Sequence, residues 1–217
     1  MLMDASTFLL FLSTSFFVVA TPGPGVIMSI TSVIRYGFRG GIWAIFGVAS
    51  GTIAMAVISS SGLGLIIATS PNVFAAIKLL GAAYLVYLGQ KLLRSKPYGL
   101  MLAHKQVQAT QPQAQCVPRK RLWLEGIVLQ MTNPLLIMFF VALFPQFVNH
   151  ESALIPQLAL LCAGYFSLVM LIHSAYGFIA ENFRVLLTSQ SAALWVNRLS
   201  GSFFLFVAAK VALDCLV

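Results

Sequence analysis

The sequence predicts an all-α membrane protein in which six transmembrane helices form two inverted three-helix repeats. Of its 217 residues, 59% are hydrophobic and only 8% are charged, whereas about a quarter of the residues in soluble domains are charged. A helix needs about 20 mostly apolar residues to cross the hydrocarbon core, and runs of that length fill most of the chain. The runs are continuous rather than alternating, which favours helices over a membrane barrel.

Hydropathy places the six expected helices at residues 6–34, 41–66, 73–93, 122–147, 154–180 and 194–216. We expect the first to be a retained helix rather than a signal peptide, because Asp4 stands where basic residues normally precede the apolar run. Five glutamines and three prolines interrupt any apolar face between 95 and 118. The chain therefore divides into a first repeat (1–94), a basic loop containing Gln and Pro (95–121) and a second repeat (122–217).

Basic residues predict the orientation of the helices. Arg35 and Arg39, the basic residues between 91 and 121, and Arg184 with Arg198 all fall on one side of the membrane. The opposite connections, 67–72 and 148–153, contain no Lys or Arg. The positive-inside rule therefore places the basic loop in the cytoplasm and both termini outside. This topology accounts for the net charge of +8, so we expect no nucleic-acid partner. Because each half has an odd number of spans, the second half enters the membrane from the opposite side, as in many secondary transporters.

Two interruptions fall in the first helix of each half. In the first, Thr21, Pro22, Gly23, Pro24 and Gly25 lie midway along an apolar run. Two prolines remove two backbone donors and two glycines tolerate unusual dihedral angles. We therefore expect the helix to break here. Backbone groups freed at that depth must face protein or a water-filled cavity, which marks a binding site.

In the second half, Thr132, Asn133 and Pro134 interrupt the fourth helix. A proline kink without a ligand remains the alternative interpretation for both interruptions. Together the two breaks predict a site for a small zwitterionic or anionic ligand, because a helix that begins after Pro24 presents amide groups to a carboxylate. Asn133 adds a donor and an acceptor from the other half.

Three ionisable residues within the expected helices are functional candidates, because charges in the membrane interior are costly. Lys78 is expected to point into the bundle to contact substrate, unless its long side chain reaches the outer surface. Glu125 is a candidate for coupling transport to protons, but it also stands four residues after Arg121, as in a surface ion pair. His173 is the other coupling candidate, because imidazole titrates near neutral pH; a hydrogen-bonded core histidine is the alternative.

Other motifs point away from catalysis. Cys116, Cys162 and Cys215 have no CxxC spacing, and the chain has no HExxH, GxSxG or phosphate-binding loop. We therefore expect neither an enzyme nor a bound metal or cofactor. Gly47 and Gly51 form a GxxxG pattern that predicts close helix packing, within the chain or between copies in a homo-oligomer.

The segment from Ala20 to Arg94, with ATPGPG, GFRGG and IKLLGAAYLVYLGQKLLR, resembles the lysine-exporter (LysE/RhtB) family of bacterial inner-membrane amino-acid exporters. The second half adds the matching TNP and FFVALFPQF. The resemblance implies six spans, an inner-membrane location and efflux of amino acids driven in many members by the proton gradient. Two positions depart from the family pattern. Gly25 stands where the family often has Asn, and Leu135 where it often has Lys, so the resemblance does not carry substrate specificity.

The sequence thus predicts a secondary exporter of amino acids or close derivatives, with neutral or polar side chains, that works by alternating access around the two breaks. The expected partners are the solute, protons and the lipid bilayer. The alternative with the same architecture is a small-solute channel or a metal-ion exporter. Metal export usually requires clustered carboxylate, His or Cys ligands, and such residues are scattered in this chain.

Overall fold

The computed structural model describes residues 3–61, 71–94, 119–149, 152–182 and 190–214. These residues form seven helices and no strand: α1 (Ala5–Ala20), α2 (Pro24–Ser61), α4 (Pro71–Arg94), α6 (Arg119–Met131), α7 (Pro134–Phe147), α8 (Leu154–Asn182) and α9 (Gln190–Asp214). Two of them, α2 and α8, are long and apolar enough to cross a membrane, and α1 is a shorter apolar helix. The all-helical prediction is confirmed for the described residues. Most of the predicted basic loop, 95–118, lies outside them.

Both predicted breaks are present. The first apolar run divides into α1, which ends at Ala20, and α2, which begins at Pro24. Proline is well suited to the first position of a helix, where its missing N–H leaves no hydrogen bond unmade. In the second half, α6 ends at Met131 and α7 begins at Pro134. The amide of Asn133 donates to the carbonyl of Gln130 (3.1 Å) and closes the turn between them.

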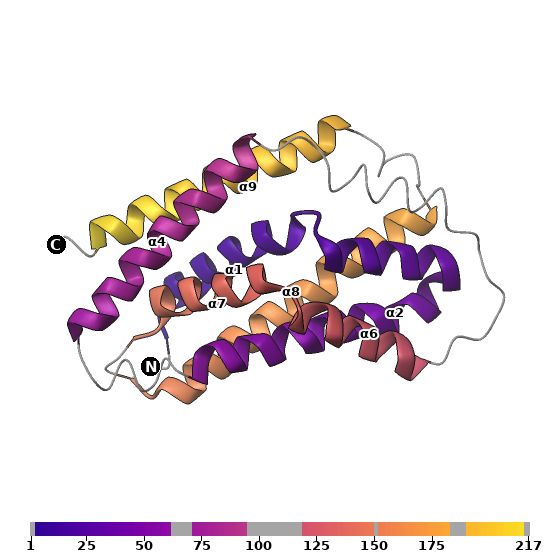
Figure 1. The fold of residues 1–217 in the computed structure, drawn as a ribbon, viewed down its shortest axis with the longest axis horizontal. Coiled ribbons are helices and arrows are strands. Elements are labelled where there is room, and N and C mark those ends of the chain that lie inside the picture. The colour runs from indigo at the N-terminus through magenta and orange to yellow at the C-terminus, as the bar shows by residue number, and fades with distance from the viewer. Residues whose placement is uncertain (1–2, 62–70, 95–118, 150–151, 183–189, 215–217) are drawn as a thin grey trace.

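The sequence predicted a non-helical connection from residue 34 to residue 41, and its predicted length was wrong. The chain stays helical from Pro24 to Ser61 apart from Gly37, whose backbone angles are φ 69° and ψ 169°. This combination is essentially restricted to glycine. The first segment of α2 continues away from α1, and the second turns back at this residue (Figure 1). The Glu181 carboxylate at the end of α8 accepts a hydrogen bond from the amide of Phe38 (3.1 Å), and so caps the second segment.

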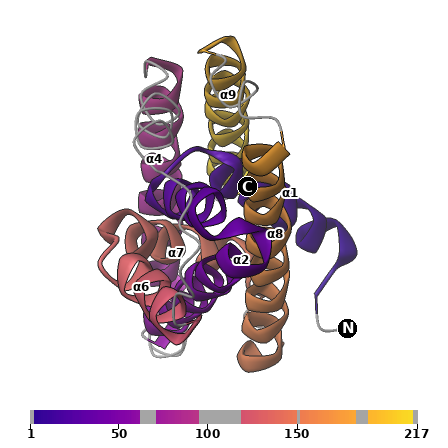
Figure 2. The ribbon, with the colours of Figure 1, turned by 90° about the vertical axis from the view of Figure 1, so that its right-hand side faces the viewer.

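The helices pack mainly between the two halves of the chain. The closest pairs are α2 with α6, α2 with α8 and α4 with α9. Every extensively packed pair joins a helix before residue 95 to one after residue 118. Figures 1 and 2 show α4 beside α9, while α2 lies between α6 and α8. The central core includes a cluster of aromatic rings in mutual contact, contributed by Phe11, Phe139, Phe140, Phe144 and Tyr165.

Glycines permit the close approach of α2 to α6. A Cβ atom on Gly47 would collide with the Trp123 carbonyl, and one on Gly51 would lie 2.8 Å from the Cα of Ile127. On the facing helix, a Cβ on Gly126 would lie 2.6 Å from the backbone nitrogen of Val48. The prediction of close packing by the GxxxG pattern is confirmed. Its second interpretation, a contact between copies of the chain, was wrong for these two glycines because α6 covers them.

We predict that Gly47→Ala lowers the stability of the protein in detergent by about 1–3 kcal/mol, because the added methyl group overfills the α2–α6 contact. The thermal unfolding midpoint, followed by size-exclusion chromatography, measures the change. Gly23→Ala is the control, since the nearest atom to its added Cβ is the Thr21 carbonyl oxygen at 3.8 Å. Equal midpoints for both variants would contradict the packing argument.

Candidate functional site

The first break places Gly25 at a point where three other segments converge. A Cβ atom on Gly25 would lie 3.2 Å from Cε1 of His173, 3.2 Å from Cγ1 of Val48 and 3.6 Å from Nε2 of Gln130. His173 belongs to α8, Val48 to the second segment of α2, and Gln130 to the last turn of α6. We call the set Gly25, Ser29, Thr52, Gln130 and His173 the Gly25 site.

The histidine of the Gly25 site is held by α2. Ser29 Oγ lies 2.9 Å from His173 Nδ1 and donates its own hydrogen to the Gly25 carbonyl at 2.8 Å. Ser29 is fully buried and His173 is only 4% exposed. The sequence placed His173 on one face with Tyr165, Val169 and Tyr176, and the structure confirms that this face points into the protein.

The glutamine of the Gly25 site is held in the same way. Gln130 Nε2 donates to Thr52 Oγ1 at 2.7 Å, and Thr52 donates to the carbonyl of Val48 at 2.8 Å. Thr52 is fully buried and Gln130 is 7% exposed. Gln130 lies in the last turn of α6, three residues before Asn133 of the second break, and its side chain reaches Gly25 of the first break. It therefore connects the two breaks.

Side chains satisfy the carbonyl groups that the first break frees at the end of α1. Tyr176 of α8 donates its hydroxyl to the Ala20 carbonyl at 2.7 Å. The Phe17 carbonyl accepts hydrogen bonds from Thr21 Oγ1 (2.7 Å) and from Ser200 Oγ of α9 (3.3 Å). The α1 side of the break is thus closed by protein, and the polar groups of the Gly25 site lie on its α2 side.

The remaining predicted substrate-binding residues fall in different places. Thr21, Pro22 and Gly23 are half-buried between α1 and α2, and Pro24 is exposed at the start of α2. Asn133 is half-buried in the second break, and Pro134 opens α7. Lys78 belongs to α4, which packs against α7 and α9; its side chain lies outside the described part of the chain.

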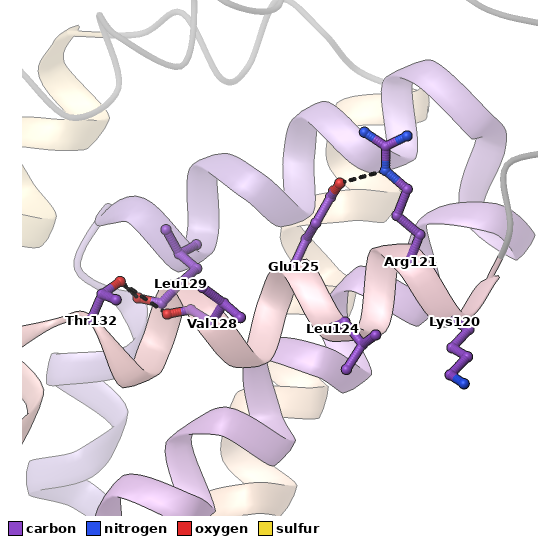
Figure 3. Close-up of a pocket in the computed structure, with 7 residues that line it drawn as sticks. All are labelled: Lys120, Arg121, Leu124, Glu125, Val128, Leu129 and Thr132. Atoms are coloured by element: carbon purple, nitrogen blue, oxygen red, sulfur yellow. Dashed lines mark hydrogen bonds and ion pairs between the residues drawn. The ribbon is translucent and has the colours of Figure 1, made fainter.

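Glu125 does not join the Gly25 site. Its carboxylate pairs with the Nε of Arg121 at 2.8 Å on the exposed surface of α6, which confirms the surface ion pair predicted as the alternative. The two side chains line an open cleft of about 640 Å³ that runs along α6 from Lys120 to Thr132. Figure 3 shows Glu125 reaching toward Arg121, and Thr132 turned back to the carbonyls of its own helix.

Sequence reasoning missed Ser29, Thr52 and Gln130. All three are uncharged polar residues within apolar runs, and such residues are common in membrane helices. The sequence position of Gln130 could have indicated it, because a polar residue one helical turn before a predicted break lies close to that break in the membrane. Nothing in the linear sequence indicated that Ser29 and Thr52 face the other half.

An all-helical chain with two interrupted helices beside a buried polar site has the architecture of a membrane transport protein. Comparison with known families agrees: a model described as LysE type translocator matches residues 16–215. The chain belongs to the LysE type translocator family, as the resemblance in its motifs predicted.

Two relatives span nearly the whole chain. The homoserine/homoserine lactone efflux protein of Salmonella typhimurium is 30% identical over 202 residues, covering 93% of this chain and 94% of that protein. The leucine efflux protein of Enterobacter sp. strain 638 is 29% identical over 200 residues, covering 91% of each. No solved structure matches the chain.

We predict that Tyr176→Phe destabilises the protein by about 1–3 kcal/mol, because it leaves the Ala20 carbonyl without its hydroxyl partner in an apolar interior. Thermal unfolding in detergent measures the effect. Tyr87→Phe is the matched control, since Tyr87 is 55% exposed. An unchanged midpoint in Tyr176→Phe would show that the break does not depend on this bond.

Proposed function

We propose that the protein exports amino acids or close derivatives with uncharged side chains across the bacterial inner membrane, by alternating access around the two broken helices. The observation that carries the proposal is the Gly25 site, where the first break meets Gln130 from the helix of the second break. Family membership supports transport. The relatives named for efflux of homoserine, its lactone and leucine support an amino-acid-like substrate.

The chemistry of the interior supports an uncharged substrate side chain. The buried polar residues of the described chain comprise Ser, Thr, Gln, Asn and His, and none is Asp, Glu, Lys or Arg. A charged substrate side chain would therefore lie in an apolar interior without an opposite charge among these residues, which is costly. The described residues also hold no group of three or more metal-ligating side chains, so the alternative of metal-ion export gains no support.

Glycine contacts support the inverted repeat. The positions of Cβ on Gly89 in α4 and on Gly201 in α9 each lie 2.8 Å from the carbonyl oxygen of the other glycine. The next atoms met are those of Leu205 and Leu93, each four residues after the opposing glycine. This is the reciprocal pattern expected where two antiparallel helices cross on a two-fold axis.

A second pair of contacts follows the same relation. Gly47 in α2 lies against Trp123 in α6, and Gly164 in α8 lies against Leu12 in α1. In Figure 1, α2 beyond its bend runs opposite to α8, and α4 runs opposite to α9. We therefore propose six membrane crossings, with α1 and the first segment of α2 forming one of them and α6 with α7 another.

We propose that the basic loop faces the cytoplasm and that both termini lie in the periplasm. Arg35 and Arg39 flank the bend in α2, and further basic residues stand at the end of α4 and the start of α6. In the proposed inverted arrangement, these ends lie on one side of the membrane. Lys210, in the last turns of α9, and Lys78, in the first half of α4, are the exceptions among the described residues.

Within the same proposal, His173 couples transport to protons. The groups that face it from α2 and α6 are Gly25, Ser29 and Gln130, all uncharged. Its nearest titratable neighbours on α8 are Tyr165 and Tyr176, and Tyr176 is bound to the Ala20 carbonyl. Glu125 is less suited to this role because its carboxylate pairs with Arg121 in the open.

Transport into everted membrane vesicles tests the function. Uptake of L-homoserine and L-leucine into vesicles is expected to saturate with concentration and to require an imposed pH gradient. Vesicles from cells without the protein provide the background. Transport that rises linearly with concentration and ignores the gradient would indicate a channel instead.

We predict that Pro24→Ala and Asn133→Ala each lower the initial transport rate about tenfold, equal to about 1.4 kcal/mol of barrier, without reducing membrane insertion. Pro156→Ala and Asn182→Ala are matched controls at exposed positions of α8. Loss of folded protein in both test variants would mean that the breaks serve assembly rather than binding.

We predict that His173→Gln slows exchange of L-leucine across vesicles at equal pH and abolishes its acceleration by a pH gradient, because glutamine cannot carry the proton. Comparing the two rates in one vesicle preparation separates coupling from folding. Acceleration equal to that of the unsubstituted protein would exclude His173 as the coupling group.

A further inference from the structure

The contacts of the Ser29 hydroxyl bear on which nitrogen of His173 carries the proton. A hydroxyl has one hydrogen, and the Gly25 carbonyl lies 2.8 Å from Ser29 Oγ, close enough to accept it. When it does, the 2.9 Å contact with His173 Nδ1 is a hydrogen bond only if Nδ1 carries a proton and donates it. A neutral imidazole has a single N–H, so Nε2 of His173 is left as an acceptor.

The Thr52 hydroxyl fixes the amide of Gln130 by the same reasoning. Thr52 donates its hydrogen to the Val48 carbonyl at 2.8 Å, so it accepts the bond from Gln130 Nε2 at 2.7 Å. A reversed amide would place two acceptor oxygens against each other. The Gln130 nitrogen therefore bonds to Thr52 and keeps a second N–H as a donor.

His173 and Gln130 both approach Gly25. A Cβ atom added to Gly25 would lie 3.6 Å from Nε2 of Gln130 and 3.2 Å from Cε1 of His173. This Cε1 atom is bonded to Nε2 of the same ring. Neither His173 Nε2 nor the second N–H of Gln130 has a further hydrogen-bond partner among the described residues. A hydrogen-bond acceptor on α8 and a donor on α6 thus both lie close to Gly25.

We propose that the Gly25 site binds the backbone of the transported amino acid, which rests on the export function proposed above. His173 Nε2 accepts a hydrogen bond from the α-amino group, and the free Gln130 N–H donates to the carboxylate or the lactone carbonyl. Ser29 and Thr52 are positioning residues that set these two roles. A solute that lacks either the amine or the carbonyl oxygen fits the site less well.

Nuclear magnetic resonance tests the orientation without any transport. Protein labelled with ¹⁵N-histidine and carrying His104→Gln and His150→Gln reports on His173 alone in lipid nanodiscs at pH 8. The expected spectrum shows the proton on Nδ1, and Ser29→Ala removes this preference. Ser167→Ala is the control, because Ser167 is an exposed serine on α8 that bonds to the carbonyl of Ala163 in its own helix. A proton on Nε2 in the protein with Ser29 intact would overturn the proposal.

Transport kinetics test the contacts with the solute. Gln130→Leu is expected to raise the KM for L-leucine about tenfold, the effect of losing one hydrogen bond to a charged group, with a smaller change in maximal rate. Thr52→Val should raise the KM to a lesser degree and Thr52→Ser should restore it. Thr31→Val is the control, since Thr31 bonds only to carbonyls of its own helix. An unchanged KM in Gln130→Leu would overturn the proposal.

Ligand addition separates failure of this inference from failure of the proposed function. Adding L-leucine is expected to shift the His173 Nε2 resonance, whereas 4-methylpentanoate, which lacks the amine, is not. A shift without any flux would support the site and contradict export of leucine. Flux without a shift would support export and overturn the assignment of the site.

Discussion

The need to satisfy every backbone group in an apolar interior determines how this chain packs. Where Pro22 and Pro24 end the regular hydrogen bonds of the first helix, carbonyl groups are freed at a depth without water. Tyr176 from α8 and Ser200 from α9 reach these carbonyls. The break therefore draws two helices of the second half against the end of α1, and the same segment becomes both a structural junction and the edge of the polar site.

Two hydroxyl groups of the Gly25 site, those of Ser29 and Thr52, are hydrogen-bonded in the same way. A Ser or Thr hydroxyl that donates to the carbonyl four residues earlier can still accept a hydrogen bond from outside its helix. Ser29 hydrogen-bonds to His173, and Thr52 accepts from Gln130. Each bond crosses between the halves of the chain, so the polar groups that we assign to the solute also register α8 and α6 against α2.

The sequence was informative wherever backbone chemistry decides the structure. Prolines and glycines predicted both breaks, and apolar runs predicted the helices to within a few residues. The sequence predicted a separate connection between the first two spans, but the structure turns the chain at one residue, Gly37, whose φ is positive. Helix therefore continues on both sides of the turn. The side chains of the site were harder to find. Whether Gln130 or Ser29 faces a partner depends on how distant helices are rotated, and a single sequence does not record that rotation.

The packing also constrains the alternating access that we propose. The extensively packed helix pairs join the first half to the second, and glycines bring α2 against α6 and α4 against α9 so closely that a methyl group does not fit. Rocking one half as a rigid body would separate these contacts together and expose backbone to lipid, which is costly. In the proposed cycle, rotation at Gly37 and at the two breaks would preserve them, because these positions lack regular helical hydrogen bonds. The residues that interrupt the helices would then serve as hinges as well as boundaries of the Gly25 site.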